Sequence, residues 1–275
     1  MSGRLLKILF GILVCGCFAG TLFAVEYRTE ANLFYLDRPE AAADDVSQEF
    51  CRLDVYHPEK GTNLPVLVWF HGGGLRGGSK NVPEGLKNQN LVVVAVNYRL
   101  FPSVHCPVYI QDAAAAVAWT FRNIGAYGGS PDKIFVSGFS AGGYLSAMIG
   151  LDLQWLGAYG IKPAQLAGVA PVSGMMSTHF TVREERGDQS KIPLLDEFSP
   201  IRHASADAPP LLLITGDREM DWPGRMEENQ LLARTMKIVG HADTTIYELQ
   251  GHGHNGGQIT AAMPIIVRWM KAHAE

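Results

Sequence analysis

A serine between two glycines, in Gly138-Phe139-Ser140-Ala141-Gly142, constrains the fold of this 275-residue chain more than any other stretch. The preceding apolar run, Lys133–Val136, is typical of a buried strand, and Gly143–Ile149 has the composition of a helix start. A serine on such a strand-to-helix turn takes a strained backbone conformation, which requires small neighbours. The pattern therefore predicts that Ser140 is exposed at the carboxyl edge of a sheet, in front of free helical N–H groups.

Apolar runs and helix-like segments alternate through the chain after residue 50. Apolar runs that are typical of strands covered on both faces occur at Pro65–Phe70, Leu91–Val96, Leu166–Ser173 and Leu211–Gly216, and Thr244–Leu249 is the last predicted strand. Helical patterns occur at Val108–Phe121, Glu227–Val239 and Gln258–Ala272. This alternation predicts an α/β fold with a mostly parallel central sheet and helices on both faces. Phe50–Tyr56 suits an early antiparallel strand, and the irregular Met175–Pro209 suits a short cap insertion.

The first 24 residues differ from the rest. Arg4 and Lys7 precede an apolar run that is short for a membrane span, and the segment ends in the small residue Ala24. This is the pattern of a secretory signal peptide, with cleavage after Ala24, and it predicts a secreted or periplasmic protein with one domain over residues 25–275. A single N-terminal membrane anchor, or a lipoprotein modified at Cys17, are the alternatives. The net charge of −4 gives no reason to expect a nucleic-acid partner.

A serine nucleophile needs a histidine base, and the base needs a carboxylate to orient it. Both residue types follow late strands, where the carboxyl edge of a parallel sheet would bring them to the serine. Asp217, Glu219 and Asp221 follow the Leu211–Gly216 run, and His252 and His254 follow the Thr244–Leu249 run.

A glycine-rich loop follows the Pro65–Phe70 run and begins His71-Gly72-Gly73-Gly74. Its backbone can approach a substrate closely because glycine has no Cβ, so its N–H groups could stabilise an oxyanion. The alternative is a flexible surface turn, which the position directly after a buried strand disfavours.

Together these motifs resemble the α/β-hydrolase family, and more closely its carboxylesterases and lipases with an HGGG loop, the hormone-sensitive-lipase-like esterases. The resemblance extends from Phe50 to the C-terminus. It rests on an ordered set of motifs: His71-Gly72-Gly73-Gly74, Asn97-Tyr98-Arg99-Leu100, Gln111-Asp112-Ala113, Gly138-Phe139-Ser140-Ala141-Gly142-Gly143, Gly216-Asp217-Arg218-Glu219 and Gly251-His252-Gly253-His254.

The resemblance implies a role for each motif. Ser140 is the expected nucleophile, with an oxyanion hole formed by Gly73, Gly74 and Ala141. The resemblance assigns His71 to holding its loop, and Arg99 and Asp112 to structural roles near the site.

The base and the acid each leave alternatives. The expected base is His254, which stands three residues after a glycine, and His252 is the alternative. The family pattern Gly-x-x-Asp places Glu219 where an aspartate is usual, so Glu219 is the expected acid, and Asp217 and Asp221 remain alternatives.

We therefore expect a serine hydrolase that cleaves carboxylic esters, short-chain or carbohydrate-linked, through an acyl-enzyme and with no metal or cofactor. An arylformamidase-like or acetylxylan-esterase-like hydrolase is one alternative, and a non-catalytic binding protein of the same fold is another. Met175, Met176 and Phe180 could line an acyl pocket or pack the cap onto the core. After removal of the signal, Cys51 and Cys106 could form a disulfide or remain free.

Overall fold

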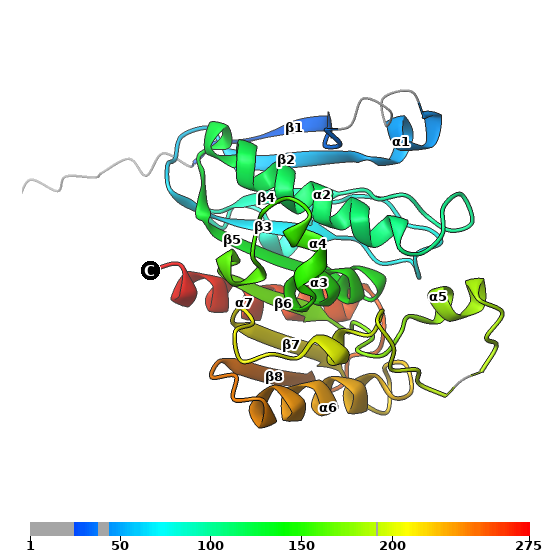
Figure 1. Cartoon of the computed structure of the whole chain (residues 1–275). Coiled ribbons are helices and arrows are strands. Elements are labelled where there is room, and N and C mark those ends of the chain that lie inside the picture. The colour runs from blue at the N-terminus through cyan, green and yellow to red at the C-terminus, as the bar shows by residue number, and fades with distance from the viewer. Residues whose placement is uncertain (1–24, 38–43, 191) are drawn as a thin grey trace, which may run out of the picture.

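A computed structural model describes residues 25–37, 44–190 and 192–275 (Figure 1). The predicted signal peptide at residues 1–24 lies outside these ranges and stays a prediction. Within them, no helix combines the length and apolar character needed to cross a bilayer.

The fold is built on one eight-stranded sheet with the order β1-β2-β4-β3-β5-β6-β7-β8. The pairs β1–β2 and β2–β4 are antiparallel, and every pair from β4 to β8 is parallel. The mostly parallel sheet predicted from the apolar runs is thereby confirmed. The strands are β1 (Tyr27–Phe34), β2 (Arg52–Pro58), β3 (Leu64–Phe70), β4 (Val92–Val96), β5 (Gly129–Phe139), β6 (Gly168–Val172), β7 (Leu211–Gly216) and β8 (Thr244–Leu249).

Helices cover both faces of this sheet, as its continuous apolar strands require (Figure 1). Alternate residues of β3 show the two layers, because Val68 packs with residues of α2 and α3 whereas Trp69 packs with residues of α7. The helices are α1 (Asp45–Phe50), α2 (Val108–Asn123), α3 (Ala141–Leu151), α4 (Leu153–Gly157), α5 (Phe180–Glu185), α6 (Arg225–Ile238) and α7 (Gly256–His273), with short 3₁₀ helices at Glu84–Leu86, Ile124–Tyr127, Pro163–Gln165 and Pro200–His203.

The N-terminal part of the domain differs from the sequence-based expectation. Strand β1 pairs with β2 at the sheet edge and was not predicted, because its exposed residues show no apolar run. The strand predicted from Phe50 begins at Arg52 instead. The side chain of Asp44 accepts hydrogen bonds from the N–H groups of Val46 and Ser47, and this cap makes residues 45–50 a helix.

The strands that carry the predicted functional residues all end at one edge. Strands β3, β5, β7 and β8 are parallel, so the loops that follow them meet there. The segment 175–209 also lies at this side and contains one helix of six residues, α5 (Figure 1). A short cap insertion is therefore present.

Arg99 and Asp112 form an ion pair within the domain. Asp112 accepts three hydrogen bonds from Arg99, from its backbone N–H at 3.0 Å and from its guanidinium at 2.9 and 2.7 Å. Cys51 and Cys106 are both free thiols, so the structure contains no disulfide between them.

Candidate active site

Ser140 lies at a sharp turn between β5 and α3. Its φ of 56° and ψ of −113° lie in a region that non-glycine residues rarely adopt. The turn is tight, since a Cβ added to Gly142 would lie 2.1 Å from the carbonyl oxygen of Phe70, and one added to Gly138 would lie 2.6 Å from the same atom. The two glycines therefore permit the conformation that exposes the Ser140 hydroxyl.

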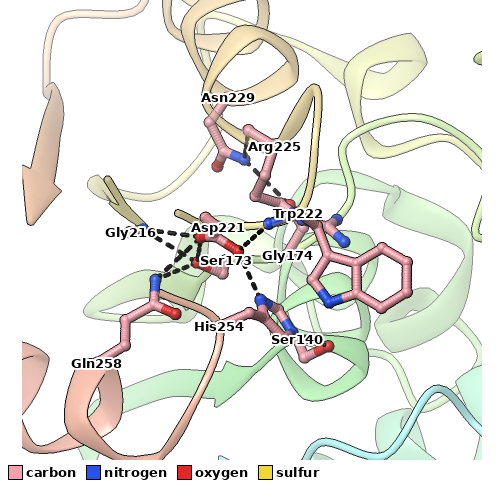
Figure 2. Close-up of polar contacts among 10 residues, drawn as sticks. All are labelled: Ser140, Ser173, Gly174, Gly216, Asp221, Trp222, Arg225, Asn229, His254 and Gln258. Carbon is pink, nitrogen blue, oxygen red and sulfur yellow. Dashed lines mark hydrogen bonds and ion pairs between the residues drawn. The ribbon is translucent and has the colours of Figure 1, made fainter. Parts of the chain in front are cut away.

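The hydroxyl of Ser140 is hydrogen-bonded to a histidine and through it to a carboxylate (Figure 2). The Oγ of Ser140 lies 2.8 Å from Nε2 of His254. The Nδ1 of the same ring lies 2.6 Å from Oδ1 of Asp221. Asp221 can only accept at Nδ1 when ionised, so Nδ1 carries the proton and Nε2 is free to accept from Ser140.

The carboxylate at His254 corrects the prediction of Glu219. Glu219 is exposed, and its N–H donates to Oδ1 of Asp217 at 3.0 Å. The family spacing of three residues after Gly216 selects the wrong residue because residues 217–221 form a helical turn. In this turn the N–H of Asp221 donates to the carbonyl of Asp217 at 2.7 Å. That turn returns the chain to the sheet edge at Asp221, which was one of the two alternatives.

Asp217 and His252, the other two alternatives from the sequence, are not part of the hydrogen-bonded triad. Asp217 accepts from the N–H of Gly251 at 2.8 Å, and its own N–H donates to the carbonyl of His252 at 2.9 Å. Asp217 therefore links the loop after β7 to the loop after β8. The side chain of His252 has no hydrogen bond to Ser140 or Asp221 within the described residues.

Asp221 is held by donors on both carboxylate oxygens (Figure 2). Oδ2 accepts from the hydroxyl of Ser173 at 2.6 Å, the N–H of Gly216 at 2.8 Å and the amide of Gln258 at 3.2 Å. Oδ1 accepts from the N–H of Trp222 at 2.7 Å as well as from His254. Burial alone would raise the pKa of Asp221, but these hydrogen bonds outweigh it and hold the pKa well below its ordinary value.

The glycine loop after β3 is rigid and lies against the serine. An added Cβ on Gly72 would lie 3.4 Å from Cβ of Ser140. Gly73, with φ 120°, accepts from two N–H groups further along the loop, and a Cβ there would lie 2.1 Å from a backbone oxygen. Of the residues that the structure describes, none accepts a hydrogen bond from the N–H of Gly73, Gly74 or Ala141.

His71 holds this loop by its backbone and ring. Its carbonyl accepts from the hydroxyl of Tyr98 at 2.9 Å, and its Nδ1 donates to the carbonyl of Gly72 at 2.7 Å. The ring stacks on Tyr98 with centroids 4.4 Å apart. Burial lowers the pKa of His71, so the ring stays neutral near neutral pH.

Two aromatic side chains border the site on the cap side. The Phe180 ring lies 3.2 Å from the position of an added Cβ on Gly74. Trp222 is 55 % exposed, and its ring lies 6.1 Å from the His254 ring and 6.2 Å from the Phe180 ring. Met175 and Met176 are buried in the core, which leaves Phe180 as the member of that predicted group beside the site.

The sequence analysis missed Ser173, Trp222, Arg225 and Gln258. Ser173 directly follows the buried strand β6, so the rule that functional residues follow strands could have selected it. Gln258 lies on α7, two helical residues after its start, and only the fold brings it to Asp221.

The chain matches models of known protein families. The BD-FAE family model matches residues 53–156. The model of the prolyl oligopeptidase family matches residues 109–275, more than half of the chain. The chain belongs to this family. As a member of the prolyl oligopeptidase family, it has the α/β-hydrolase fold that its motifs and its sheet indicate, and the family resemblance stated from the sequence is confirmed.

Proteins similar to this family member are named esterases. The esterase LipC of Mycobacterium tuberculosis is 28 % identical over 69 % of this chain and 52 % of LipC. The probable carboxylic ester hydrolase LipM of the same organism is 30 % identical over 55 % of this chain and 40 % of LipM. The solved structure of a hyperthermophilic esterase from Pyrobaculum calidifontis is 26 % identical, with a TM-score of 0.65 over 81 % of each chain. The chain therefore spans about half the length of LipC and two fifths of the length of LipM.

Proposed function

We propose that the protein is a serine hydrolase of carboxylic esters, in which Ser140, His254 and Asp221 form the catalytic triad. The observation that carries the proposal is the continuous pair of hydrogen bonds from Ser140 Oγ to His254 Nε2 and from His254 Nδ1 to Asp221 Oδ1. Serine attacks an ester only when a base removes its proton, and this arrangement supplies that base in the correct tautomer.

The reaction begins when Ser140 Oγ attacks the ester carbonyl and its proton passes to His254 Nε2. The imidazolium that forms is stabilised by the Asp221 carboxylate, which hydrogen bonding keeps ionised. His254 then protonates the leaving alcohol, which leaves an acyl group on Ser140. Water hydrolyses this acyl-enzyme by the same steps in reverse.

The oxyanion that forms during attack needs donors that are already in place. We assign this role to the N–H groups of Gly73, Gly74 and Ala141, which have no acceptor among the described residues; the two glycines adopt positive φ angles that other residues rarely take. Each such donor is worth about 3–4 kcal/mol of transition-state stabilisation in related sites.

The size of the cap affects which esters can reach the triad. The one α-helix in the described part of segment 175–209 has six residues, and Trp222 beside the triad is exposed. Such an open site favours small soluble esters over long-chain lipids. The esterase names of the relatives support an ester rather than a peptide substrate.

Turnover of p-nitrophenyl acetate by the wild type and by Ser140→Ala tests the proposal. Ser140→Ala should lower kcat by more than about 10⁴-fold, the scale of losing the nucleophile of a triad. p-Nitroacetanilide and acetylated xylan, assayed in parallel, show whether an amide or a carbohydrate-linked ester is also cleaved. Wild-type rates no greater than those of Ser140→Ala on every substrate would refute the proposal.

A further inference from the structure

Arg225, at the start of α6, is a buried arginine without a hydrogen-bond acceptor. It is 6 % exposed, and its Nε is fully buried and unpaired. No hydrogen bond or ion pair reaches its guanidinium from residues 25–37, 44–190 or 192–275. Arg183, which is equally buried, instead donates to the carbonyls of Ser190 and Ile192 at 2.9 and 2.7 Å.

The nearby carboxylates do not provide the missing acceptor. Glu228 and Asp221 attract the Arg225 charge through space. Glu228, however, already accepts from two backbone N–H groups and the hydroxyl of Ser177, and Asp221 accepts from His254 and four further donors. Burial lowers the pKa of Arg225, which shows the cost of keeping this cation away from water.

His179 supplies a second unpaired donor close to Arg225. Its Nδ1 accepts from the N–H of Thr181 at 3.2 Å, so the proton of the neutral ring lies on Nε2, for which the described residues offer no acceptor. Burial, and then the positive charges of Arg225, Arg183 and Arg76, hold the pKa of His179 well below its ordinary value. The His179 residue is 1 % exposed.

His179 and Arg225 each contact one member of the aromatic pair that borders the triad, Phe180 and Trp222. The His179 ring lies 4.2 Å from the Phe180 ring, and Phe180 contacts the Gly74 position. On the other side, the N–H of Arg225 donates to the carbonyl of Trp222 at 3.0 Å. Figure 2 draws Arg225 within the group of residues that includes Trp222, Ser140 and His254.

A guanidinium fork and an imidazole N–H fit a carboxylate, which offers two oxygens and a negative charge. We propose that Arg225 and His179 bind a carboxylate carried by the ester substrate, so that the enzyme prefers esters with a free carboxylate near the scissile bond. This inference rests on the ester hydrolase activity proposed above. It names a class of substrate that the triad alone does not select.

The test compares matched anionic and neutral esters. On the acyl side, p-nitrophenyl hemiglutarate is compared with p-nitrophenyl 5-methylhexanoate, in which two methyl groups replace the carboxylate oxygens. On the alcohol side, 4-acetoxybenzoate is compared with 4-isopropylphenyl acetate. For each pair, the ratio of kcat/KM for the anionic ester to that for the neutral ester is measured in the wild type and in Arg225→Met, so that differences in leaving group cancel.

The ratio should fall by about ten- to a hundredfold in Arg225→Met for at least one pair, which also identifies the side that carries the carboxylate. The control is Arg234→Met, which removes an exposed arginine from the same helix and the same charge from the protein. Equal ratios in the wild type and Arg225→Met for both pairs would overturn the proposal, as would an equal loss in Arg234→Met.

If Arg225→Met does not fold, competitive inhibition of the wild type tests the carboxylate site instead. Glutarate and benzoate should inhibit hydrolysis of the neutral esters competitively and more strongly than glutaramide and benzamide. Equal inhibition by acids and amides, or none, would contradict the carboxylate site. If the wild type cleaves no ester, the proposed function fails, and calorimetric titration of glutarate into wild type and Arg225→Met then decides the binding site separately.

Discussion

Replacing Asp221 with Asn tests which carboxylate serves His254. The change preserves the size of the side chain and removes its charge. The fixed donors around the carboxylate are the N–H of Gly216 at Oδ2 and the N–H of Trp222 at Oδ1. The NH₂ of an asparagine would therefore face a backbone donor in either orientation, and it could not balance an imidazolium.

The expected fall in kcat follows from the distance between Asp221 Oδ1 and His254 Nδ1, which is 2.6 Å. At an effective dielectric constant of about 20, opposite unit charges this close attract by about 6 kcal/mol. Most of this stabilisation arises only when His254 is protonated in the reaction, so kcat should fall by about 10⁴-fold.

The assay is kcat for p-nitrophenyl acetate, with urea unfolding to confirm that the variant is folded. Glu219→Gln is the matched control, since Glu219 is exposed and two residues away, and its kcat should stay within about twofold of wild type. A folded Asp221→Asn within tenfold of wild type, or a loss above tenfold in Glu219→Gln, would refute the assignment of Asp221.

Two further predictions concern stability and thiol chemistry. Because the folded-state pKa of Asp221 is depressed, its stabilising contribution is present above its unfolded pKa and is lost as the pH falls through the folded pKa. Ser173→Ala removes one of the hydrogen bonds that hold the pKa of Asp221 low. This variant should therefore lower the free energy of unfolding by about 1.5–3 kcal/mol at neutral pH and by less below about pH 4. Urea unfolding across pH measures the difference, and a difference that does not change with pH would contradict the prediction. Burial raises the pKa of Cys51 and of Cys106 to about 12, so both thiols stay protonated at pH 8. Both should therefore react with Ellman's reagent only after unfolding, which peptide mass mapping can show for each cysteine. Fast labelling of either thiol in the folded protein would contradict this prediction.

The fold was largely predictable because its evidence is local. The strands β3, β4 and β7 and the central part of β5 are apolar runs, and Ser140 follows the last of these at the start of a helix. Strand β1 was not predicted because it lies at the sheet edge and four of its eight residues, Arg28, Thr29, Glu30 and Asn32, are polar.

The site was predictable only where spacing along the chain decides it. Ser140 and His254 are fixed by strand ends, whereas the choice of acid depends on one helical turn between Asp217 and Asp221. The partners Ser173 and Gln258 lie 48 and 37 residues from Asp221 in the sequence, so their contact depends on how β6 and α7 pack. Arg225 is distinctive only through the absence of an acceptor in the described structure, which no sequence pattern records.

Strand β8 carries the loop that holds His254, and it is one of the two edge strands of the sheet. Among the described residues it pairs only with β7, and none of its residues is buried, whereas every residue of β7 is. Edge strands of this kind open locally at a smaller free energy than the core does, and their amides exchange with solvent first. We therefore expect the loop that carries His254 to detach from Ser140 while the rest of the domain stays native, so that the resistance of this protein to inactivation depends on an edge strand rather than on its core.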